Sequence, residues 1–412
     1  MRVPKVLYIT YDGVLEPIAQ SQALSYIKEL RKRGLKFYLL SFEKRENLSD
    51  SDYLSAIERD LKEKGITWLR LRYHSSPKLL STFFDVMAGV LFCFPVVWKN
   101  KIRIVHARSE VAAAIAFVIS HIFRTKFIYD RRGIMAYDYT EGGMWPKNSV
   151  ITKMIFTLVN TLDKRFLLFS DYTVVLTQKV AERLKGDFLK FKKKLKIKVI
   201  PCCVDLSRFK YIERDVTPLN ELSISNKFIL LYIGSFGTWN MLREMVDFFV
   251  ELKKNKQNAH LLIITLSNHN FVENIIKEAS LNIEDCTIIG KKFSDIPDYV
   301  ALADAAVMFR TPVFSQIASC PTKFGEYLAC GLPIVINSKI GDTQEIIQRN
   351  KIGVVVNDFS VSAYNRAVKE LLLLIEGDGA LRRRCRDIAR QHFSLDYGVK
   401  SYLEVYQKVL NN

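Results

Sequence analysis

The sequence lacks the cysteine patterns of disulfide-stabilised and zinc-binding proteins. It has seven cysteines, an odd number, and no C-x-x-C pair, while Cys202 and Cys203 are adjacent. These spacings indicate neither a disulfide framework nor a zinc site, and they favour a reducing compartment. The opening residues MRVPKVLYITYDG enter a strand pattern at once, without the pattern of a signal peptide. We therefore expect a cytoplasmic protein.

Several cofactor and metal motifs are missing as well. The sequence contains no G-x-G-x-x-G fingerprint, no P-loop and no histidine cluster, and it has no low-complexity segment. We therefore expect no bound cofactor and no metal ion.

The positive charge is unevenly distributed. The chain has 412 residues and a net charge of +18. Residues 1–200 hold 36 Lys and Arg against 19 Asp and Glu, whereas residues 201–412 hold 25 against 24. A basic half beside a neutral half suggests that one half meets an anionic partner, such as a membrane surface, nucleic acid or a phosphate-bearing substrate. For a single cluster, such as Lys190–Lys198, a solvated basic surface is the competing interpretation.

Strand and helix patterns alternate along the chain in two rounds. Short β-rich runs such as KVLYIT, RIVHA and KFIYD are separated by segments with helical spacing, and the alternation restarts at KFILLYIGS after a polar connection over Lys210–Lys227. This rhythm is typical of parallel sheets covered by helices. We predict an α/β protein with two doubly wound, Rossmann-like domains, whose ligands bind beyond the carboxyl ends of the strands.

The segment Leu79–Trp98 is long and apolar enough to cross a bilayer, but Asp85 and Pro95 interrupt it. A buried helix followed by a strand is one interpretation, and a helix lying on a membrane surface is another. A transmembrane span is the least favoured of the three. The neighbouring lysines Lys99 and Lys101 fit a peripheral membrane contact.

Two glycine-containing loops follow strands. The loop Tyr232–Trp239 lies between a strand and a helix, so its backbone N–H groups are suited to hold a phosphate, although a plain turn explains it equally well. The loop Tyr11–Gln22 occupies the same place in the first half, with a helix that opens at Pro17 or Ser21. A third glycine-containing stretch, Thr140–Trp145, predicts an acceptor loop or a simple turn.

The stretch SCPTKFGEYLACGLPIVINSKIGDTQEII, Ser319–Ile347, predicts a helix over Phe324–Cys330 that ends at Gly331 and leads into a strand. Glu326 would lie near the helix start, where the helix dipole favours an acid. This stretch resembles the signature of the retaining, family-4-like glycosyltransferases of the GT-B fold. The similarity continues in YITYDGVLEPIAQSQ, VIPCCVDLSRF, LYIGSFGTW and HFSLDYGVKSYLEVYQKVL, in the same order and spacing.

The resemblance implies two facing Rossmann-like domains with a C-terminal helix that crosses back to the first domain. We place an acceptor domain at residues 1–205, a nucleotide-sugar donor domain at 206–390 and the returning helix at 391–412. It also implies transfer of a sugar from a nucleotide-diphosphate sugar to a hydroxyl of a saccharide or lipid-linked acceptor, with retention and without a metal. The nucleotide sugar is a co-substrate rather than a cofactor.

By this resemblance Glu326 accepts hydrogen bonds from the donor ribose, a role suited to a fixed carboxylate. The family often has a second glutamate eight positions earlier, where this chain has Ala318, and Gln316, Ser319 or a backbone group would replace it. The loop SFGTWN also lacks the family's cations, so Lys323 and Arg310 are the candidates to neutralise the diphosphate. The expected donor-binding residues are Gly234, Ser235, Phe236, Gly237, Arg310, Ser319, Lys323, Phe324 and Glu326.

In the first domain, Asp130 ends a strand where several family members have an active-site histidine. We expect it at the catalytic centre together with Lys323 and Glu326, and the alternative is that Asp130 orients the adjacent arginines. His106 also lies at a strand end, where it could face the cleft, although a lone histidine is more often structural. The expected acceptor-binding residues are Asp12, Gly13, Gln20, His106, Arg108, Arg131 and Arg132.

The resemblance and the charge together predict a cytoplasmic enzyme of polysaccharide or glycan biosynthesis, peripheral on the inner face of the membrane and with no nucleic-acid partner. The sequence also fits rival interpretations. A nucleotide-sugar epimerase shares the fold, but it poorly explains the basic half. A noncatalytic membrane-binding or nucleic-acid-binding protein would explain the charge, but the chain has no recognised nucleic-acid motif.

Overall fold

The computed structural model describes residues 3–146, 149–189, 194–211, 222, 224–292 and 294–411, without the side chains of Lys78 and Leu79. The chain forms two compact units. Unit 1 comprises Met1–Pro201 and Gly398–Asn412, and unit 2 comprises Cys202–Tyr397. Parts of the basic cluster Lys190–Lys198 and of the expected connection Lys210–Lys227 lie outside the described residues.

Unit 1 is built on a seven-stranded parallel sheet in the order β3-β2-β1-β4-β5-β6-β7. The strands are β1 (Lys5–Thr10), β2 (Lys36–Glu43), β3 (Thr67–Arg72), β4 (Ile104–Arg108), β5 (Lys126–Arg131), β6 (Tyr172–Val175) and β7 (Ile197–Val199). The strand order reverses direction between β1 and β4. Such a switch point is where open α/β sheets place their ligands.

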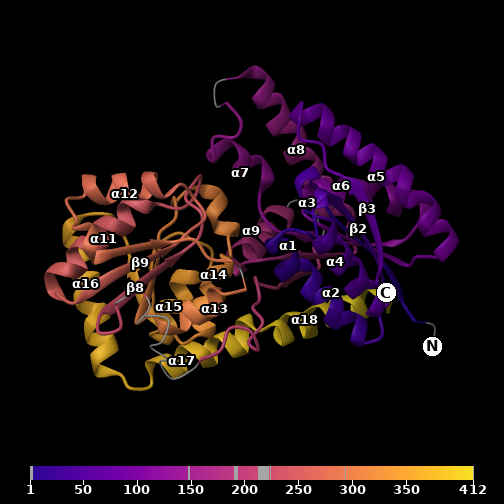
Figure 1. The fold of residues 1–412 in the computed structure, drawn as a ribbon. Coiled ribbons are helices and arrows are strands. Elements are labelled where there is room, and N and C mark those ends of the chain that lie inside the picture. The colour runs from indigo at the N-terminus through magenta and orange to yellow at the C-terminus, as the bar shows by residue number, and fades with distance from the viewer. Residues whose placement is uncertain are drawn as a thin grey trace. The chain divides into compact units, whose positions relative to one another are not determined.

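The helices of unit 1 lie between these strands (Figure 1). They are α1 (Pro17–Ala19), the π-helical turn η1 (Gln20–Leu24), α2 (Ser25–Lys32), α3 (Arg45–Ser49), α4 (Ser51–Glu63), α5 (Lys78–Asn100), α6 (Glu110–Phe123), α7 (Met135–Glu141), α8 (Val150–Phe169) and α9 (Gln178–Leu189). The C-terminal helix α18 (Leu395–Leu410) starts in unit 2, and its residues from Gly398 onward belong to unit 1.

Unit 2 repeats the architecture with a six-stranded parallel sheet in the order β10-β9-β8-β11-β12-β13. Its strands are β8 (Phe228–Ile233), β9 (Ala259–Ile264), β10 (Cys286–Ile289), β11 (Ala305–Met308), β12 (Ile334–Asn337) and β13 (Gly353–Val356). Its helices are α11 (Leu242–Asn255), α12 (His269–Glu278), η2 (Ile283–Asp285), α13 (Ile296–Leu302), η3 (Phe314–Ala318), α14 (Thr322–Ala329), α15 (Thr343–Asn350), α16 (Val361–Gly377), α17 (Leu381–Ile388) and η4 (Ala389–Phe393). The switch point lies between β8 and β11.

Apolar packing on both faces of the unit 2 sheet explains the continuous hydrophobic runs of its strands. Along β8, Ile229 and Leu231 point into one buried cluster, whereas Leu230 and Tyr232 point into the other. A parallel strand covered on both faces reads as an uninterrupted apolar run, as FILLYI does. The helix α11 lies beside α12 and α16 over one of these faces (Figure 1).

The predicted fold class, a GT-B protein of two parallel-sheet α/β domains with a returning C-terminal helix, is confirmed. The expectation of a helix followed by a strand in Leu79–Trp98 is wrong, because the single helix α5 continues to Asn100. Pro95 is exposed within this helix. The carbonyl of Leu91, which Pro95 cannot bond, therefore lies on the solvent side, and the helix tolerates the proline.

Candidate functional site

The switch point of unit 2 brings two predicted donor residues to one edge of the sheet. Gly234 follows β8, and Arg310 follows the adjacent strand β11. A short antiparallel bridge joins Asn240 to Arg310, so the loop after β8 is tied to the end of β11. The glycine loop and the guanidinium are therefore neighbours at the carboxyl ends of the strands.

The loop after β8 needs glycine at its first position. Gly234 has a φ of 150°, and a Cβ there would lie 2.9 Å from the Tyr232 hydroxyl. The Tyr232 ring stacks on Phe236 with centroids 4.7 Å apart, and the Phe236 N–H donates to Ser267 Oγ at 2.9 Å. Gly237 has open space around it. The loop is thus fixed at Phe236 and open at Gly237.

Arg310 is positioned by neutral side chains. Its Nε donates to Gln316 Oε1 at 2.9 Å, and its Nη1 donates to Asn240 Oδ1 at 3.5 Å. Its backbone N–H donates to Asn337 Oδ1 at 2.8 Å. Asn240 also donates to the Ser235 carbonyl at 2.8 Å. Amide oxygens are neutral acceptors, and these hydrogen bonds fix the orientation of the guanidinium.

The α14 helix carries the predicted ribose acceptor, Glu326. Lys323 Nζ donates to Glu326 Oε2 at 2.8 Å, and both side chains are largely buried. The helix starts at Thr322 rather than Phe324, so Glu326 lies in its second turn. The expected support from the helix dipole is therefore wrong, because that effect is confined to the first turn. The ammonium of Lys323 is the close positive partner instead.

The position of α14 is set by its inner face. The Tyr327 hydroxyl accepts from the Ile233 N–H at 2.9 Å, which joins α14 to the end of β8 just before the glycine loop. Phe324, predicted to bind the donor, has a fully buried side chain that packs edge-to-face on Phe393. The structure thus corrects that expectation, because the Phe324 ring belongs to the core. The Ser319 N–H donates to the Gln316 carbonyl at 3.1 Å, which places Ser319 beside the residues that hold Arg310.

The structure reveals one cation near Glu326 that the sequence interpretation missed. Burial lowers the pKa of Arg208, and the charges of Glu326 and Asp205 oppose this shift. Arg208 lies in VIPCCVDLSRF, a stretch that was assigned only to the end of the first domain. The sequence signal for a role of Arg208 was a charged residue next to the apolar run VIPCCV.

The switch point of unit 1 carries an ion pair between two predicted acceptor residues. Arg108 Nη1 donates to Asp12 Oδ2 at 2.9 Å; the arginine side chain is buried and that of Asp12 is 44% exposed. Gly13 has no room for a side chain, because a Cβ would lie 2.6 Å from Glu43 Oε2. The Glu43 carboxylate accepts from the Val14 N–H at 2.9 Å, and burial raises its pKa. Glu43 therefore fixes the loop that presents Asp12.

Gln20 lies in the π-helical turn η1 that follows this loop. The helix opens at Pro17, as one of the two sequence alternatives stated. The Gln20 Nε2 donates to the Tyr53 hydroxyl, and Tyr53 in turn donates to the Leu15 carbonyl at 3.3 Å. Gln20 is only half-buried. Its side chain is therefore accessible to a ligand next to the loop that carries Asp12.

Asp130 is buried in a network that reaches the C-terminal helix. Its Oδ2 accepts from the Tyr402 hydroxyl at 2.7 Å, and Arg132 donates to its Oδ1 at 3.4 Å. His106 is fully buried; its Nδ1 lies 2.6 Å from the Tyr406 hydroxyl and its Nε2 lies 3.6 Å from Asp130. Burial acts to raise the pKa of Asp130, but Arg132 and His106 bring it below its usual range.

This network changes the interpretation of two predicted site residues. His106, expected to face the cleft, points instead to α18 in the interior of unit 1, and burial lowers its pKa. The carboxylate of Asp130 likewise meets α18 and the adjacent Arg132, which agrees with the orienting role that was the alternative. Both side chains hold the helix that returns from unit 2.

Arg131 belongs to a second buried network on the other face of β5. Its Nε and Nη2 donate to the two oxygens of Asp163 at 3.1 and 2.9 Å. The Tyr129 hydroxyl donates to Asp163 Oδ1 at 2.7 Å. Burial and the charge of Asp163 raise the pKa of nearby Glu110 to about 7. Arg131 is thus an internal ion-pair partner rather than an open acceptor-binding group.

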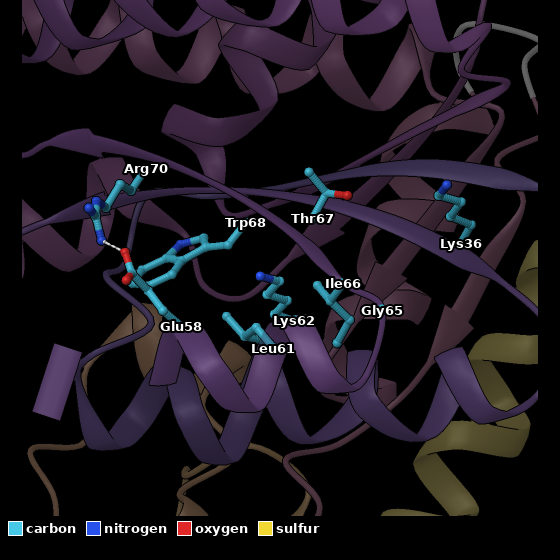
Figure 2. A pocket seen from close by; sticks show the side chains of 9 residues that line it. All are labelled: Lys36, Glu58, Leu61, Lys62, Gly65, Ile66, Thr67, Trp68 and Arg70. Carbon is cyan, nitrogen blue, oxygen red and sulfur yellow. Dashed lines mark hydrogen bonds and ion pairs between the residues drawn. The ribbon is translucent and has the colours of Figure 1, made fainter. Parts of the chain in front are cut away.

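A cavity of about 650 Å³ lies elsewhere in unit 1, against the edge strand β3 (Figure 2). Figure 2 shows Trp68 and the Glu58–Arg70 ion pair on one side and Lys36 on the other. None of the predicted site residues lines it. Lys36 and Thr67 are the first residues of β2 and β3, so the cavity reaches the amino ends of these strands. Within the part of the chain that the structure describes, no three His, Cys, Asp or Glu side chains are grouped to hold a metal ion.

One protein-family model matches part of the chain. Residues 217–392 match the family model of glycosyl transferases group 1. A search of the curated proteins gave no match.

Similar solved structures cover 96–100% of the chain. A glycosyltransferase from Rickettsia africae is 16% identical, with a TM-score of 0.71 and coverage of 100% of both chains. Anabaena Alr3699/HepE in complex with UDP is 14% identical, with a TM-score of 0.70 over 98% of this chain and 99% of that one. WaaG, a glycosyltransferase involved in lipopolysaccharide biosynthesis, is 14% identical, with a TM-score of 0.63 over 96% and 98%. The chain therefore has the GT-B fold, and its residues 217–392 match the glycosyl transferases group 1.

Proposed function

We propose that the protein is a glycosyltransferase that moves a sugar from a nucleoside diphosphate sugar, with UDP as the first nucleotide to test, to a hydroxyl of a saccharide or lipid-linked saccharide. One observation carries this proposal: the glycine loop, Arg310 and the Lys323–Glu326 pair are joined at the switch point of unit 2. The segment that holds them matches a glycosyltransferase family, and a protein of the same fold binds UDP.

The donor roles follow from the chemistry of these groups. The carboxylate of Glu326 accepts hydrogen bonds from the ribose hydroxyls, with Lys323 fixing its orientation. Arg310 and Lys323 contact the diphosphate, and the backbone N–H groups near Gly234 and Gly237 supplement them. Gln316 and Ser319 replace the family acid that is missing at Ala318. Gln316 accepts from Arg310, and Ser319 donates to the Gln316 carbonyl just before α14.

The reaction we propose retains the anomeric configuration. The bond from the sugar to the nucleotide diphosphate breaks, and the acceptor hydroxyl attacks on the same face. The positive groups of unit 2 stabilise the charge that develops on the leaving phosphate, which is the main requirement of this chemistry. A donor phosphate oxygen takes the acceptor proton. No metal takes part in this scheme, so we expect activity to persist in a chelator.

We place the acceptor in unit 1. Asp12 and Gln20 are accessible beside the switch point of that unit, and Arg108 holds Asp12 in place. Carboxylate and amide side chains suit the hydroxyl groups of a sugar. Asp130 acts as a positioning residue that fixes Arg132 and α18.

The proposal is tested by turnover. Purified protein is incubated with a UDP-sugar and a lipid-linked saccharide extract, UDP release is measured, and the anomer of the product is determined by NMR. Acceptor-dependent UDP release with a retained anomer supports the proposal. Acceptor-independent conversion of the UDP-sugar to its epimer would instead establish the epimerase alternative, and an inverted product would refute retention.

A further inference from the structure

Helix α5 in unit 1 exposes an apolar stripe that the donor and acceptor sites do not use. Its most exposed large side chains recur every three or four residues and so share one face of the helix. They are Leu80, Phe83, Phe84, Met87, Leu91, Phe94 and Trp98, each 44–69% exposed. The helix is long and apolar enough to cross a bilayer by length and composition alone.

The opposite face of α5 is fixed to unit 1, which argues against a spanning helix. The buried carboxylate of Asp85 accepts from the Tyr11 hydroxyl at 2.8 Å and lies 2.6 Å from His74 Nδ1. At Gly89 a Cβ would come within 2.6 Å of Ile115 on α6. A helix that crossed the bilayer would lose these contacts and expose Asp85 to lipid. The exposed stripe therefore suits a helix that lies flat in the membrane–water interface.

The apolar surface continues from α5 across α6 to α8, which lie together in unit 1 (Figure 1). Phe94 of α5 contacts Phe123 of α6 with ring centroids 4.7 Å apart, and His121 contacts Phe169 of α8 at 4.8 Å. Further exposed apolar side chains extend this surface: Val118, Ile122, Val150, Ile151, Met154 and Leu158. We call the exposed side chains of α5, α6 and α8 the α5–α6–α8 face.

The charges of the α5–α6–α8 face have one sign. The three helices contain three acidic residues, Asp85, Glu110 and Asp163, and all three are buried. The described basic side chains of these helices, and those that follow α5 and α6 directly, are exposed: Lys99, Lys101, Arg124, Lys153, Lys164 and Arg165. An apolar surface that carries only positive charge is complementary to anionic lipid, whose headgroups attract such residues.

We propose that the α5–α6–α8 face docks unit 1 onto an anionic bilayer, with the apolar side chains entering the headgroup region and the lysines and arginines contacting lipid phosphates. Docking itself is independent of the transfer reaction. Only the consequence that a lipid-borne acceptor is presented to unit 1 rests on the proposed function.

The test is co-sedimentation of the full chain with vesicles of phosphatidylcholine and phosphatidylglycerol at 7:3, and with phosphatidylcholine alone. We expect binding to the mixed vesicles that weakens at least tenfold in pure phosphatidylcholine. Leu91→Ser with Trp98→Ser should weaken binding at least tenfold. The matched control is Leu266→Ser with Leu373→Ser, which changes apolar residues of unit 2 that are at least as exposed and should bind as the wild type.

A second variant changes charges instead of apolar residues, so the test does not depend on whether Leu91→Ser with Trp98→Ser folds. Lys153→Glu with Lys164→Glu should also weaken binding at least tenfold, whereas Arg59→Glu with Lys185→Glu, at exposed positions on α4 and α9, should not. Donor binding by each variant, measured by thermal shift with UDP, reports the transferase site separately. Vesicle binding that is equal in all variants would overturn the proposal. So would a wild-type dimer in analytical ultracentrifugation that Leu91→Ser with Trp98→Ser converts to monomer, since a second copy would then cover the face.

Discussion

Units 1 and 2 have the same strand order over six strands, but the arginines at the carboxyl ends of their strands have different hydrogen-bond partners. In unit 1 the arginines are bound by carboxylates of the same unit, as in Arg108–Asp12 and Arg131–Asp163. In unit 2 Arg310 is oriented by the amide oxygens of Gln316 and Asn240. An amide fixes a guanidinium without cancelling its charge. In unit 1 these charged pairs stabilise the fold, and we propose that Arg310 of unit 2 contacts the donor diphosphate.

The largest effect on this comparison should come from the Arg131–Asp163 pair. Arg131→Met leaves a buried carboxylate without its cation, which costs about 3–5 kcal/mol of unfolding free energy. We expect chemical denaturation to show this loss while UDP binding to folded protein is unchanged. The double variant Arg131→Met with Asp163→Leu should recover part of the stability. A stable Arg131→Met protein that no longer uses its acceptor would instead assign Arg131 to the acceptor site.

In unit 2 we expect a loss of ligand affinity with little loss of stability. Arg310→Met removes a charge-assisted contact to the diphosphate, worth about 1.5–3 kcal/mol, so the Kd for UDP should rise about 10- to 100-fold. The melting temperature without ligand should change little. Calorimetric titration measures the affinity, and Arg349→Met, at an exposed position of α15, is the control. An unchanged Kd would show that Arg310 is as structural as the arginines of unit 1.

Tyr402→Phe probes the attachment of α18 to unit 1. It removes the donor to Asp130 Oδ2 and should lower the unfolding free energy by about 1–2 kcal/mol. A double-mutant cycle with Asp130→Asn measures the coupling between the two groups. Additive effects of the two substitutions would show that this hydrogen bond does not fasten α18 to β5.

A further effect should appear as a pH dependence of the stability of unit 1. The pKa of Glu110 is raised to about 7, so the folded protein binds a proton that the unfolded chain has lost. Stability from this group is present at pH 4.5 and falls as the pH rises through 7. Glu110→Gln should flatten the pH profile of the unfolding free energy over that window. An unchanged profile would place the titration elsewhere.

The sequence predicted those features that depend on local residues. The glycine at 331 adopts a φ of 80° and ends α14, and the strand that follows Pro333 forms as β12. The parallel sheets also follow from the alternation of strands and helices. The start of α14 at Thr322 was missed, because no capping side chain marks it.

The roles of individual charged residues depend on partners far along the chain. Asp130 is bound by Tyr402, 272 residues later, and no local pattern announces that contact. Both faces of β5 are buried, so its sequence could not show that Arg131 and Asp130 point into separate networks. Arg310 is held by Asn240, 70 residues earlier, and no local pattern predicts that contact either. Sequence patterns therefore placed these residues at strand ends but not on a particular face.

The central claim is that unit 2 binds a nucleoside diphosphate sugar through Glu326. The most direct measurement is the thermal shift of the wild type, Glu326→Ala and the exposed-position control Glu370→Ala with UDP and a panel of UDP-, GDP-, ADP- and dTDP-sugars. A ligand at 100 times its Kd adds about 2.7 kcal/mol of stability, which gives a clear shift. We predict that UDP and UDP-sugars stabilise the wild type and the control but not Glu326→Ala. Equal stabilisation of all three proteins, or of none by any nucleotide, would contradict the claim.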